Sequence, residues 1–462
     1  MLTRNIWTAF FLTGWAVWGI TSPAPARAQQ ASLEQAAAST PGSSRCRSLS
    51  DSDLSELTLI AALEHVVCRS PLVSQALLLV DEQRAGVELA QTAWRPRVAA
   101  NAELAANRIP ISNSGAGSLG SSLTGALGLS WVAYDYGLRD ANLQLSRFQL
   151  DSARAAQQAA TLTAVDQALR LYVEAAAAQA RLQASQETEN VARQSLAAAQ
   201  AKHEAHVVSL AEKLQAQTAF AQSALDRVRA EGAWQTARGS LAVAMGYPAD
   251  KAIKLASPAM AFPTISSSGT PVAWIEESKR LHPRVRTVQA DVQALRARLD
   301  GLRSEGRGNV VISGNVGRTK DLANRDAKLD NALGGYVFAN FPLFNQTEMD
   351  ARERQILSQI ESRLSALMQV ERDVEADLWQ GIRLMETEAE NLKASNLLLQ
   401  AATQSYEIAF GRYKSGVGSI LELLATQTAL SNGRSQLTQA QLSHAHARLR
   451  LEVASGRILM VR

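Results

Sequence analysis

The 462-residue sequence is poor in aromatic residues, and long stretches of it lack glycine and proline. Only 5% of the residues are Phe, Trp or Tyr, although 46% are hydrophobic. A large globular core draws on many aromatic side chains, whereas chains rich in alanine and leucine favour long helices packed through small residues. Residues 138–231 contain neither Gly nor Pro, and residues 343–462 contain no Pro. These absences exclude a chain built from short elements joined by frequent turns.

An excess of charge of one sign is also absent, because 47 Lys and Arg stand against 43 Asp and Glu. This balance gives no basic footprint for nucleic acid. The sequence holds no G-x-S-x-G, no H-E-x-x-H and no Gly-rich phosphate loop. His203, His206, His444 and His446 are spaced by three and by two residues with no cysteine nearby, which is not a metal-ligand pattern. We therefore expect no enzyme, no cofactor and no metal site.

The N-terminal residues are typical of an export signal. Arg4 precedes an apolar run over residues 6–20, and Ala26-Arg27-Ala28 forms an A-x-A cleavage site. The run is shorter than the about 20 residues of a membrane-spanning helix. We expect residues 1–28 to be cleaved, and the alternative is a retained anchor.

Cysteine is scarce, with two residues in the whole chain. No cysteine follows the cleavage site directly, which argues against a lipid-anchored N-terminus. Residues 29–55 would form an N-terminal arm that contains Cys46. Because export leads to an oxidising compartment, a Cys46–Cys68 disulfide could tie this arm to the first helix, and two buried thiols are the alternative.

Two stretches of the chain align without gaps at an offset of 210 residues. Residues 201–246 match residues 411–456, so that Ser209 corresponds to Ser419 and Glu212 to Glu422. We expect two copies of one unit, a linker and a short tail. Their bounds are residues 56–246 and 272–456 for the copies, 247–271 for the proline-marked linker and 457–462 for the tail. A duplicated enzyme domain would give the same alignment, so the content of the unit must decide.

Each unit begins with a helix, over about 57–94 and 272–304, followed by two segments of alternating character. Residues 123–131 carry apolar residues or glycine at odd positions and small or polar residues at even positions. Such alternation over about ten residues is typical of a membrane-spanning β-strand. An ordinary amphipathic hairpin is the alternative. The expected strands are about 97–109, 123–136, 309–318 and 331–344, and the aromatic residues near them, which fit an interfacial girdle, are Trp131, Tyr134, Tyr136, Tyr336, Phe338, Phe341 and Phe344.

Each hairpin leads into a very long helix. If residues 138–206 are one helix, it is about 100 Å long. Apolar residues recur there in steps of three and four, which predicts a coiled-coil seam formed by Leu162, Val165, Leu169, Tyr172 and Ala176. A coiled-coil spacer would show the same pattern. If the strands enter a membrane, several chains must share them, since an open sheet edge does not persist in lipid.

The ordered set of segments resembles the TolC-type outer-membrane efflux protein family, and more its secretion branch than its lipoprotein branch. The strings that carry the resemblance are "LIAALEHVVCRSPLV" (59–73), "AWRPRV" (93–98), "LSWVAYDYGLRDA" (129–141), "VVSLAEKLQAQTA" (207–219) and "GVGSILELLATQTA" (416–429). The resemblance implies a mainly α fold with a small β part. It implies a homotrimer whose pooled strands form a 12-stranded outer-membrane β-barrel continuous with a periplasmic α-helical barrel.

The same resemblance implies a passive exit duct in the outer membrane that extends into the periplasm. Its partners would be outer-membrane lipid, a periplasmic adaptor and an inner-membrane ABC or other transporter. Its cargo would be a protein toxin or small molecules. The paired cysteines are similar to those of ducts for large toxins. A periplasmic coiled-coil adaptor or scaffold without a channel remains the alternative.

The two tips share the pattern S-x-x-E, in Ser209 to Glu212 and Ser419 to Glu422. This is a capping box, in which the Ser oxygen and the Glu carboxylate each accept a backbone N–H of the new helix. One interpretation is that both Glu residues are caps only. The resemblance implies more: Glu422 would narrow the periplasmic entrance.

The resemblance also assigns roles to other tip residues. Glu212 would help hold the tips closed, with Tyr413 as its partner. The chain would reverse at Gly416 and Gly418, and Gly418 stands where a basic latch residue occurs in relatives. Ala425 stands in place of a second carboxylate, so the closed state would be held less tightly.

Overall fold

The computed structural model describes residues 56–109, 118–256, 271–322 and 330–456. The described part is mainly helical with a small antiparallel sheet, as expected. The predicted signal peptide (1–28), the arm (29–55), the tail (457–462) and residues 257–270 of the linker lie outside the described residues. The elements in chain order are α3 (Leu59–Arg69), α4 (Pro71–Gln91), η2 (Thr92–Trp94), β1 (Arg97–Ile109), β2 (Ser118–Tyr134), α5 (Leu138–Glu204), α6 (Leu210–Ala244), α8 (Pro271–Leu281), α9 (Pro283–Glu305), β3 (Asn309–Asp321), β4 (Asp330–Asn340), α10 (Gln346–Ser415) and α11 (Ile420–Ala454).

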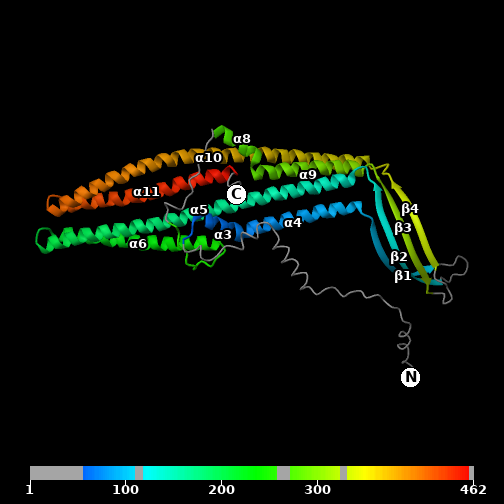
Figure 1. Ribbon diagram of the computed structural model, residues 1–462, viewed down its shortest axis with the longest axis horizontal. Coiled ribbons are helices and arrows are strands. Elements are labelled where there is room, and N and C mark those ends of the chain that lie inside the picture. Colours follow the sequence, from blue (N-terminus) through cyan, green and yellow to red (C-terminus); the bar gives the residue numbers. More distant parts are fainter. Residues whose placement is uncertain (1–55, 110–117, 257–270, 323–329, 457–462) are drawn as a thin grey trace, which may run out of the picture. The chain divides into compact units, whose positions relative to one another are not determined.

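The long helices form two antiparallel hairpins, α5 with α6 and α10 with α11 (Figure 1). Helix α5 is 67 residues long and α10 is 70 residues long. The expected seam of α5 is buried throughout, from Leu162 to Ala176. The core where α3, α5 and α6 meet is rich in alanine. Small side chains let these helices approach closely, which accounts for the scarcity of aromatic residues.

Proline breaks both helices that were expected as single elements. The expected helix 57–94 divides at Ser70, where Pro71 begins α4, and the expected helix 272–304 divides at His282, where Pro283 begins α9. Proline has no N–H to donate and forces the residue before it into an extended conformation, so both breaks have the same cause. Among the described residues no single helix has the length and hydrophobicity to cross a membrane, although α3 with α4 and η2, bent by 50°, passes that test as a pair.

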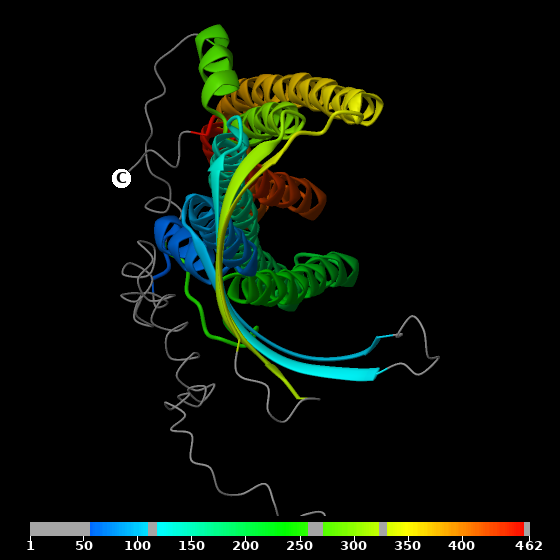
Figure 2. The same ribbon diagram turned by 90° about the vertical axis from the view of Figure 1, so that its right-hand side faces the viewer.

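The strands form one antiparallel sheet in the order β1-β2-β3-β4, which is strongly curved (Figure 2). Two of the strands, β2 and β4, end earlier than expected. Strand β2 ends at Tyr134 rather than at 136, because Tyr136 and Gly137 have positive φ values of 52° and 92° and turn the chain into α5. Strand β4 ends at Asn340 rather than at 344, since Pro342 cannot donate a ladder hydrogen bond. Strands β2 and β3 also extend further toward the hairpin loops, from Ser118 and to Asp321.

The register gives the sheet one apolar and one polar face, because residues opposite each other in an antiparallel pair share a face. Leu127 lies opposite Ala100 and Val316, and Val316 lies opposite Leu333. The described side chains of this apolar face include Val98, Ala100, Ala102, Leu104, Leu123, Leu127, Leu129, Trp131, Ile312, Val316, Leu333 and Val337.

The polar face carries small and hydrophilic side chains over most of its described area. Thr124 and Thr319 are hydrogen-bonded across β2 and β3 at 3.1 Å. Further along, Asn315 lies opposite Gly128 and Gly334. A sheet with two faces of such different character fits two different surroundings, one apolar and one aqueous.

Candidate functional site

The two hairpin tips are built in the same way. In the first tip the Val207 N–H donates to the Lys202 carbonyl at 2.9 Å, and in the second the Val417 N–H donates to the Arg412 carbonyl at 3.0 Å. Each bond closes the last turn of a long helix around a residue of positive φ, His206 at 53° and Gly416 at 85°. This arrangement satisfies carbonyl groups that a helix end otherwise leaves unpaired. The predicted chain reversals therefore lie at 205–209 and 416–419.

Gly416 and Gly418 serve the second tip for different reasons. A Cβ at Gly416 would meet nothing within 4 Å, so the positive φ is what favours glycine there. Gly418 has no positive φ, but a Cβ there would lie 3.0 Å from the Tyr413 nitrogen and 3.1 Å from the Arg412 Cβ. The absence of a side chain at Gly418 therefore lets the turn pack against the end of α10.

Both returning helices are capped by the predicted serines. The Ser209 hydroxyl accepts from the Glu212 N–H at 3.3 Å, and the Ser419 hydroxyl accepts from the Glu422 N–H at 3.2 Å. The Glu422 carboxylate faces the guanidinium of Arg412, with 3.6 Å between oxygen and nitrogen. The hydrogen bond that the serine contributes to a capping box is thus present in both tips. The Glu422 side chain, in contrast, contacts Arg412 at the end of α10.

Tyr413 is the buried centre of the tip region. Its side chain is 1% exposed and packs with Ala199 and Ala216 of the first hairpin and with Ile420 and Leu423 of the second. Burial raises the pKa of Tyr413 above its usual value, and the negative charge of Glu212 raises it further. The tyrosine therefore stays protonated at physiological pH, and it joins the two hairpins.

Lys202 adds a second connection between the hairpins. Its ammonium group lies 4.0 Å from the centroid of the Tyr413 ring and donates a hydrogen bond to the Tyr413 carbonyl. A cation over an aromatic face is worth about 0.5–2 kcal/mol, and more as water is excluded. The first hairpin thus contacts the end of α10 through Lys202 and Tyr413. Tyr413 is also the residue whose pKa the charge of Glu212 raises.

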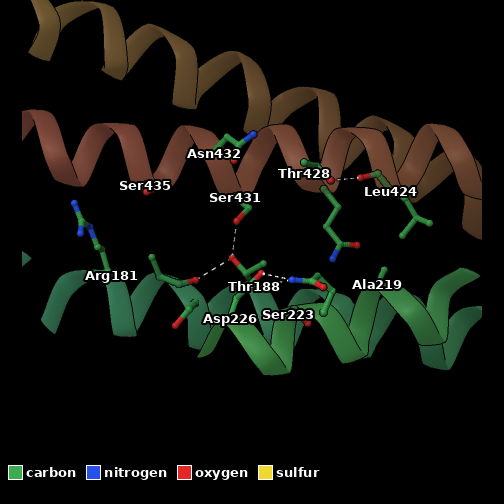
Figure 3. Close-up of a pocket in the computed structure, with 14 residues that line it drawn as sticks. Arg181, Thr188, Ala219, Ser223, Asp226, Leu424, Thr428, Ser431, Asn432 and Ser435 are labelled. Carbon is green, nitrogen blue, oxygen red and sulfur yellow. Dashed lines mark hydrogen bonds between the residues drawn. The ribbon is translucent and has the colours of Figure 1, made fainter. Parts of the chain in front are cut away.

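A polar groove separates the hairpins further from the tips. It has a volume of about 350 Å³ and is lined by residues of α5, α6 and α11. Thr188 and Ser431 point toward one another across it, with 3.2 Å between their hydroxyl oxygens (Figure 3). Ser195 donates to Gln427 at 3.3 Å, and Arg434 pairs with Glu187 at 3.2 Å. These polar contacts lie between two apolar clusters that also join the hairpins, one around Tyr413 and one that includes Leu442 and Leu449.

Lys202 and Arg412 were not predicted from the sequence as residues of the tips. The resemblance drew attention to Gly418 as the position of a basic latch residue, whereas the basic groups of this tip come from Lys202 and Arg412. A signal was present, because the offset of 210 aligns Lys202 with Arg412. What no pattern revealed is that Lys202 contacts the other hairpin while Arg412 contacts its own.

Two further expectations concern the cysteines and the histidines. Cys68 lies in α3 and is disulfide-bonded, but its predicted partner Cys46 lies outside the described residues, so the pairing itself stays a prediction. The Nδ1–H of His203 donates a hydrogen bond to the Val208 carbonyl, 3.2 Å away. In the described ranges no group of three or more His, Cys, Asp or Glu side chains could hold a metal ion.

The chain matches the family model "outer membrane efflux protein" over residues 62–247 and 274–457. It is 27% identical to Protein CyaE of Bordetella pertussis over 393 residues, which cover 84% of this chain and 82% of that protein. The fold is similar to that of a membrane protein from Pseudomonas aeruginosa, with a TM-score of 0.76, 18% identity and coverage of 87% and 94%. It is also similar to the outer membrane protein VceC of Vibrio cholerae, with a TM-score of 0.72, 16% identity and coverage of 86% and 96%.

The family model covers most of the chain, and the solved structures share its fold over nearly their whole length. Proteins of this family are channels of the outer membrane that extend into the periplasm, and they are not enzymes. They act as trimers with adaptor and inner-membrane transporter partners. These findings confirm the resemblance seen in the sequence. The chain belongs to the outer membrane efflux protein family.

Proposed function

We propose that this chain is one protomer of a trimeric exit duct, which passively conducts cargo from an inner-membrane transporter through the periplasm and the outer membrane. The observation that carries the proposal is the four-stranded sheet with one apolar and one polar face. Its outer strands β1 and β4 have no further partner strand among the described residues. Since an unpaired edge is not stable in lipid, the sheet needs further copies to close a barrel.

The cargo we propose is a protein rather than a small molecule. The supporting observation is the likeness to Protein CyaE, which favours secretion. A periplasmic adaptor or scaffold is the less supported alternative. Such a protein needs no apolar sheet face, whereas Val98, Leu104, Leu333 and Val337 expose between 70% and 88% of their surface.

We propose that the hairpin tips are the gate of this duct. In a trimer Glu212 and Glu422 of three chains would surround the periplasmic entrance. Opening would move the second hairpin away from the first, and this would break the Lys202–Tyr413 contact. The polar contacts of the groove, such as Thr188 with Ser431, suit a boundary that opens and closes.

The test is the ion current of the purified protein in planar lipid bilayers. We expect cation-selective channels, because rings of carboxylates favour cations. Neutralising Glu422 as Glu422→Gln should lower the preference for cations, and Arg412→Gln should raise it, since Arg412 offsets the charge of Glu422 at 3.6 Å. A substitution that merely disturbs the fold would not be expected to change the cation preference in opposite directions at Glu422 and Arg412.

The matched control is Glu390→Gln, which removes an exposed carboxylate of α10 that is paired with Lys393 outside the tips. Its selectivity should remain that of the wild type. If Glu422→Gln and Arg412→Gln both leave the selectivity unchanged, the Glu residues are helix caps and the tips do not form the gate. A purified protein that never conducts would rule out the duct as a whole.

A further inference from the structure

Two cations of strand β3 lie on the apolar face of the sheet. Arg318 is opposite Gly125, and Lys320 is opposite Leu123. Both side chains are exposed. They continue the row of Val316, because alternate residues of a strand share a face. Positive charge therefore follows directly on the apolar residues of this strand, toward the end that is farther from the helices.

The carboxylates of the sheet lie on its other face. Glu103 is opposite Thr124, and Asp330 is opposite Thr319. These two threonines are hydrogen-bonded to each other on the polar face. Among the described side chains of the apolar face there is no Asp or Glu. The apolar face is thus positively charged at one end, and such a surface attracts anions.

The surroundings of the two cations leave them able to bind a ligand. The Nε of Arg318 donates to the side-chain oxygen of Asn331 at 2.9 Å. This bond orients the guanidinium and leaves its two terminal nitrogens to donate elsewhere. A Cβ at Gly125 would meet nothing within 4 Å, so the space beside Arg318 is open. In the part of the chain that the structure describes, neither Arg318 nor Lys320 pairs with a carboxylate.

The position of the cations along the strand matches the boundary of a membrane. Val310 lies on the same face, and Arg318 follows eight residues later. At about 3.4 Å per residue and a strand tilt of about 40°, this separation is about 21 Å across the membrane. The apolar band of membrane barrels is about 25 Å tall. Because the helices extend into the periplasm, Arg318 and Lys320 lie near the headgroups of the outer leaflet.

We infer that Arg318 and Lys320 bind the phosphate groups of lipid A, the glycolipid of the outer leaflet. The inference rests on the proposed barrel, in which the apolar face contacts lipid. Arginine can bind a phosphate through two parallel hydrogen bonds, and lysine binds it as a point charge. The acyl chains would lie on Val316 and its apolar neighbours. Another copy of the chain would pair at the edges β1 and β4, which leaves the face of the inner strand β3 to lipid.

The experiment measures the binding of lipid A to the purified protein in detergent micelles by native mass spectrometry. Lipid A with two phosphates should bind more tightly than lipid A with one, and fully dephosphorylated lipid A should bind most weakly. Inorganic phosphate in excess should displace little lipid A, because the acyl chains also contribute to binding. Complete displacement by inorganic phosphate would show a simple anion site and would contradict lipid as the occupant.

The variant that tests the site is Arg318→Gln with Lys320→Gln. One Lys or Arg near an anionic membrane surface changes affinity about fivefold, so the apparent Kd for lipid A should rise about 10- to 30-fold. The matched control is Arg97→Gln, which removes an exposed cation of the polar face and should retain the wild-type affinity. Arg318→Lys with Lys320→Arg keeps both charges and should retain most of the affinity, which separates the loss of charge from a disturbed fold.

Two results with these variants would contradict the inference. One is a double Gln variant that binds lipid A as tightly as the wild type. The other is an equal loss of affinity in Arg97→Gln and in Arg318→Gln, because binding would then depend on net charge and not on this site. The ion current of the same preparation in planar bilayers separates the inference from the proposed duct. A normal current without phosphate-dependent binding overturns the lipid site alone, whereas a protein without current contradicts the duct and the outward position of this face together.

Discussion

At the scale of single residues, the two tips offer opposite substitutions at equivalent positions. His206 and Gly416 both have positive φ, which costs a residue with a Cβ about 1–2 kcal/mol relative to glycine. Gly416→Ala should therefore destabilise its tip, and His206→Gly should stabilise the other. Amide hydrogen exchange of residues 405–420 should become roughly five- to tenfold faster in Gly416→Ala, and exchange of residues 200–210 slower in His206→Gly.

Gly416→Asn is the control, because asparagine tolerates this conformation better than alanine. It should recover most of the protection. If Gly416→Ala exchanges as slowly as the wild type, the turn does not depend on the left-handed conformation. Gly418→Ala should also speed up exchange, but through the contact with Tyr413, so Asn at that position would not help.

The residues of the tips show how far the sequence could go. The serine caps, the acidic residues and the turns could be predicted because they depend on neighbours within a few positions. The burial of Tyr413 under the first hairpin could not, since it depends on packing between residues about 200 positions apart. The predicted interfacial girdle was wrong for Tyr336 and Phe338, which lie opposite Ser313 and Val311 and so do not share the apolar face. Their face could have been predicted, because both are even-numbered in a strand whose apolar positions are odd.

At the scale of elements, the break between α8 and α9 gives a dependence on pH. The unprotonated Nδ1 of His282 accepts from the Arg284 N–H at 3.2 Å and so caps α9. Burial, and then the charge of Arg284, lower the pKa of His282 to about 4, although Asp377 opposes this shift. Asp166 and Arg450 line the same cavity. Protonation would remove the acceptor of the cap.

Because the folded pKa lies below the ordinary value of about 6.5, the unfolded chain binds the proton first. The contribution of His282 to stability is complete above pH 6.5 and is lost as the pH falls toward 4. The expected loss is on the order of 2 kcal/mol. Thermal unfolding at pH 7.5 and pH 5 should show a larger decrease for the wild type than for His282→Asn, whose side chain can cap without titrating. If the melting temperature decreases equally in the wild type and in His282→Asn, groups other than His282 cause the sensitivity to acid.

The helices and strands could be predicted from the sequence more completely than the breaks between them. The strands could be predicted by alternation and the long helices by the absence of glycine and proline, because both are repeated local signals. The breaks at Pro71 and Pro283 were missed, although proline has a known local effect, because the apolar pattern continues on both sides. The face of each helix that contacts another chain could not be predicted, because a pattern within one chain does not distinguish contacts within the chain from contacts between chains.

At the scale of the whole molecule, the proposed barrel requires β1 of one chain to pair with β4 of the next. Strand β1 begins and β4 ends at the helices, so the two strands are antiparallel when copies are placed side by side. On the apolar face the available positions are even in β1 and odd in β4. A disulfide needs Cα atoms about 4.4–6.8 Å apart and side chains on the same face.

Pairs of cysteines can therefore test both the interface and the number of chains. Ala100→Cys or Ala102→Cys combined with Ala339→Cys should form disulfides between chains in at least one register, seen on non-reducing gels. Ala99→Cys with Ala339→Cys should form none, because Ala99 lies on the opposite face. The bands should extend to three chains and stop there, since a closed ring has no free edge. A ladder beyond three chains would indicate an open assembly, and single chains in every pair would contradict the shared barrel.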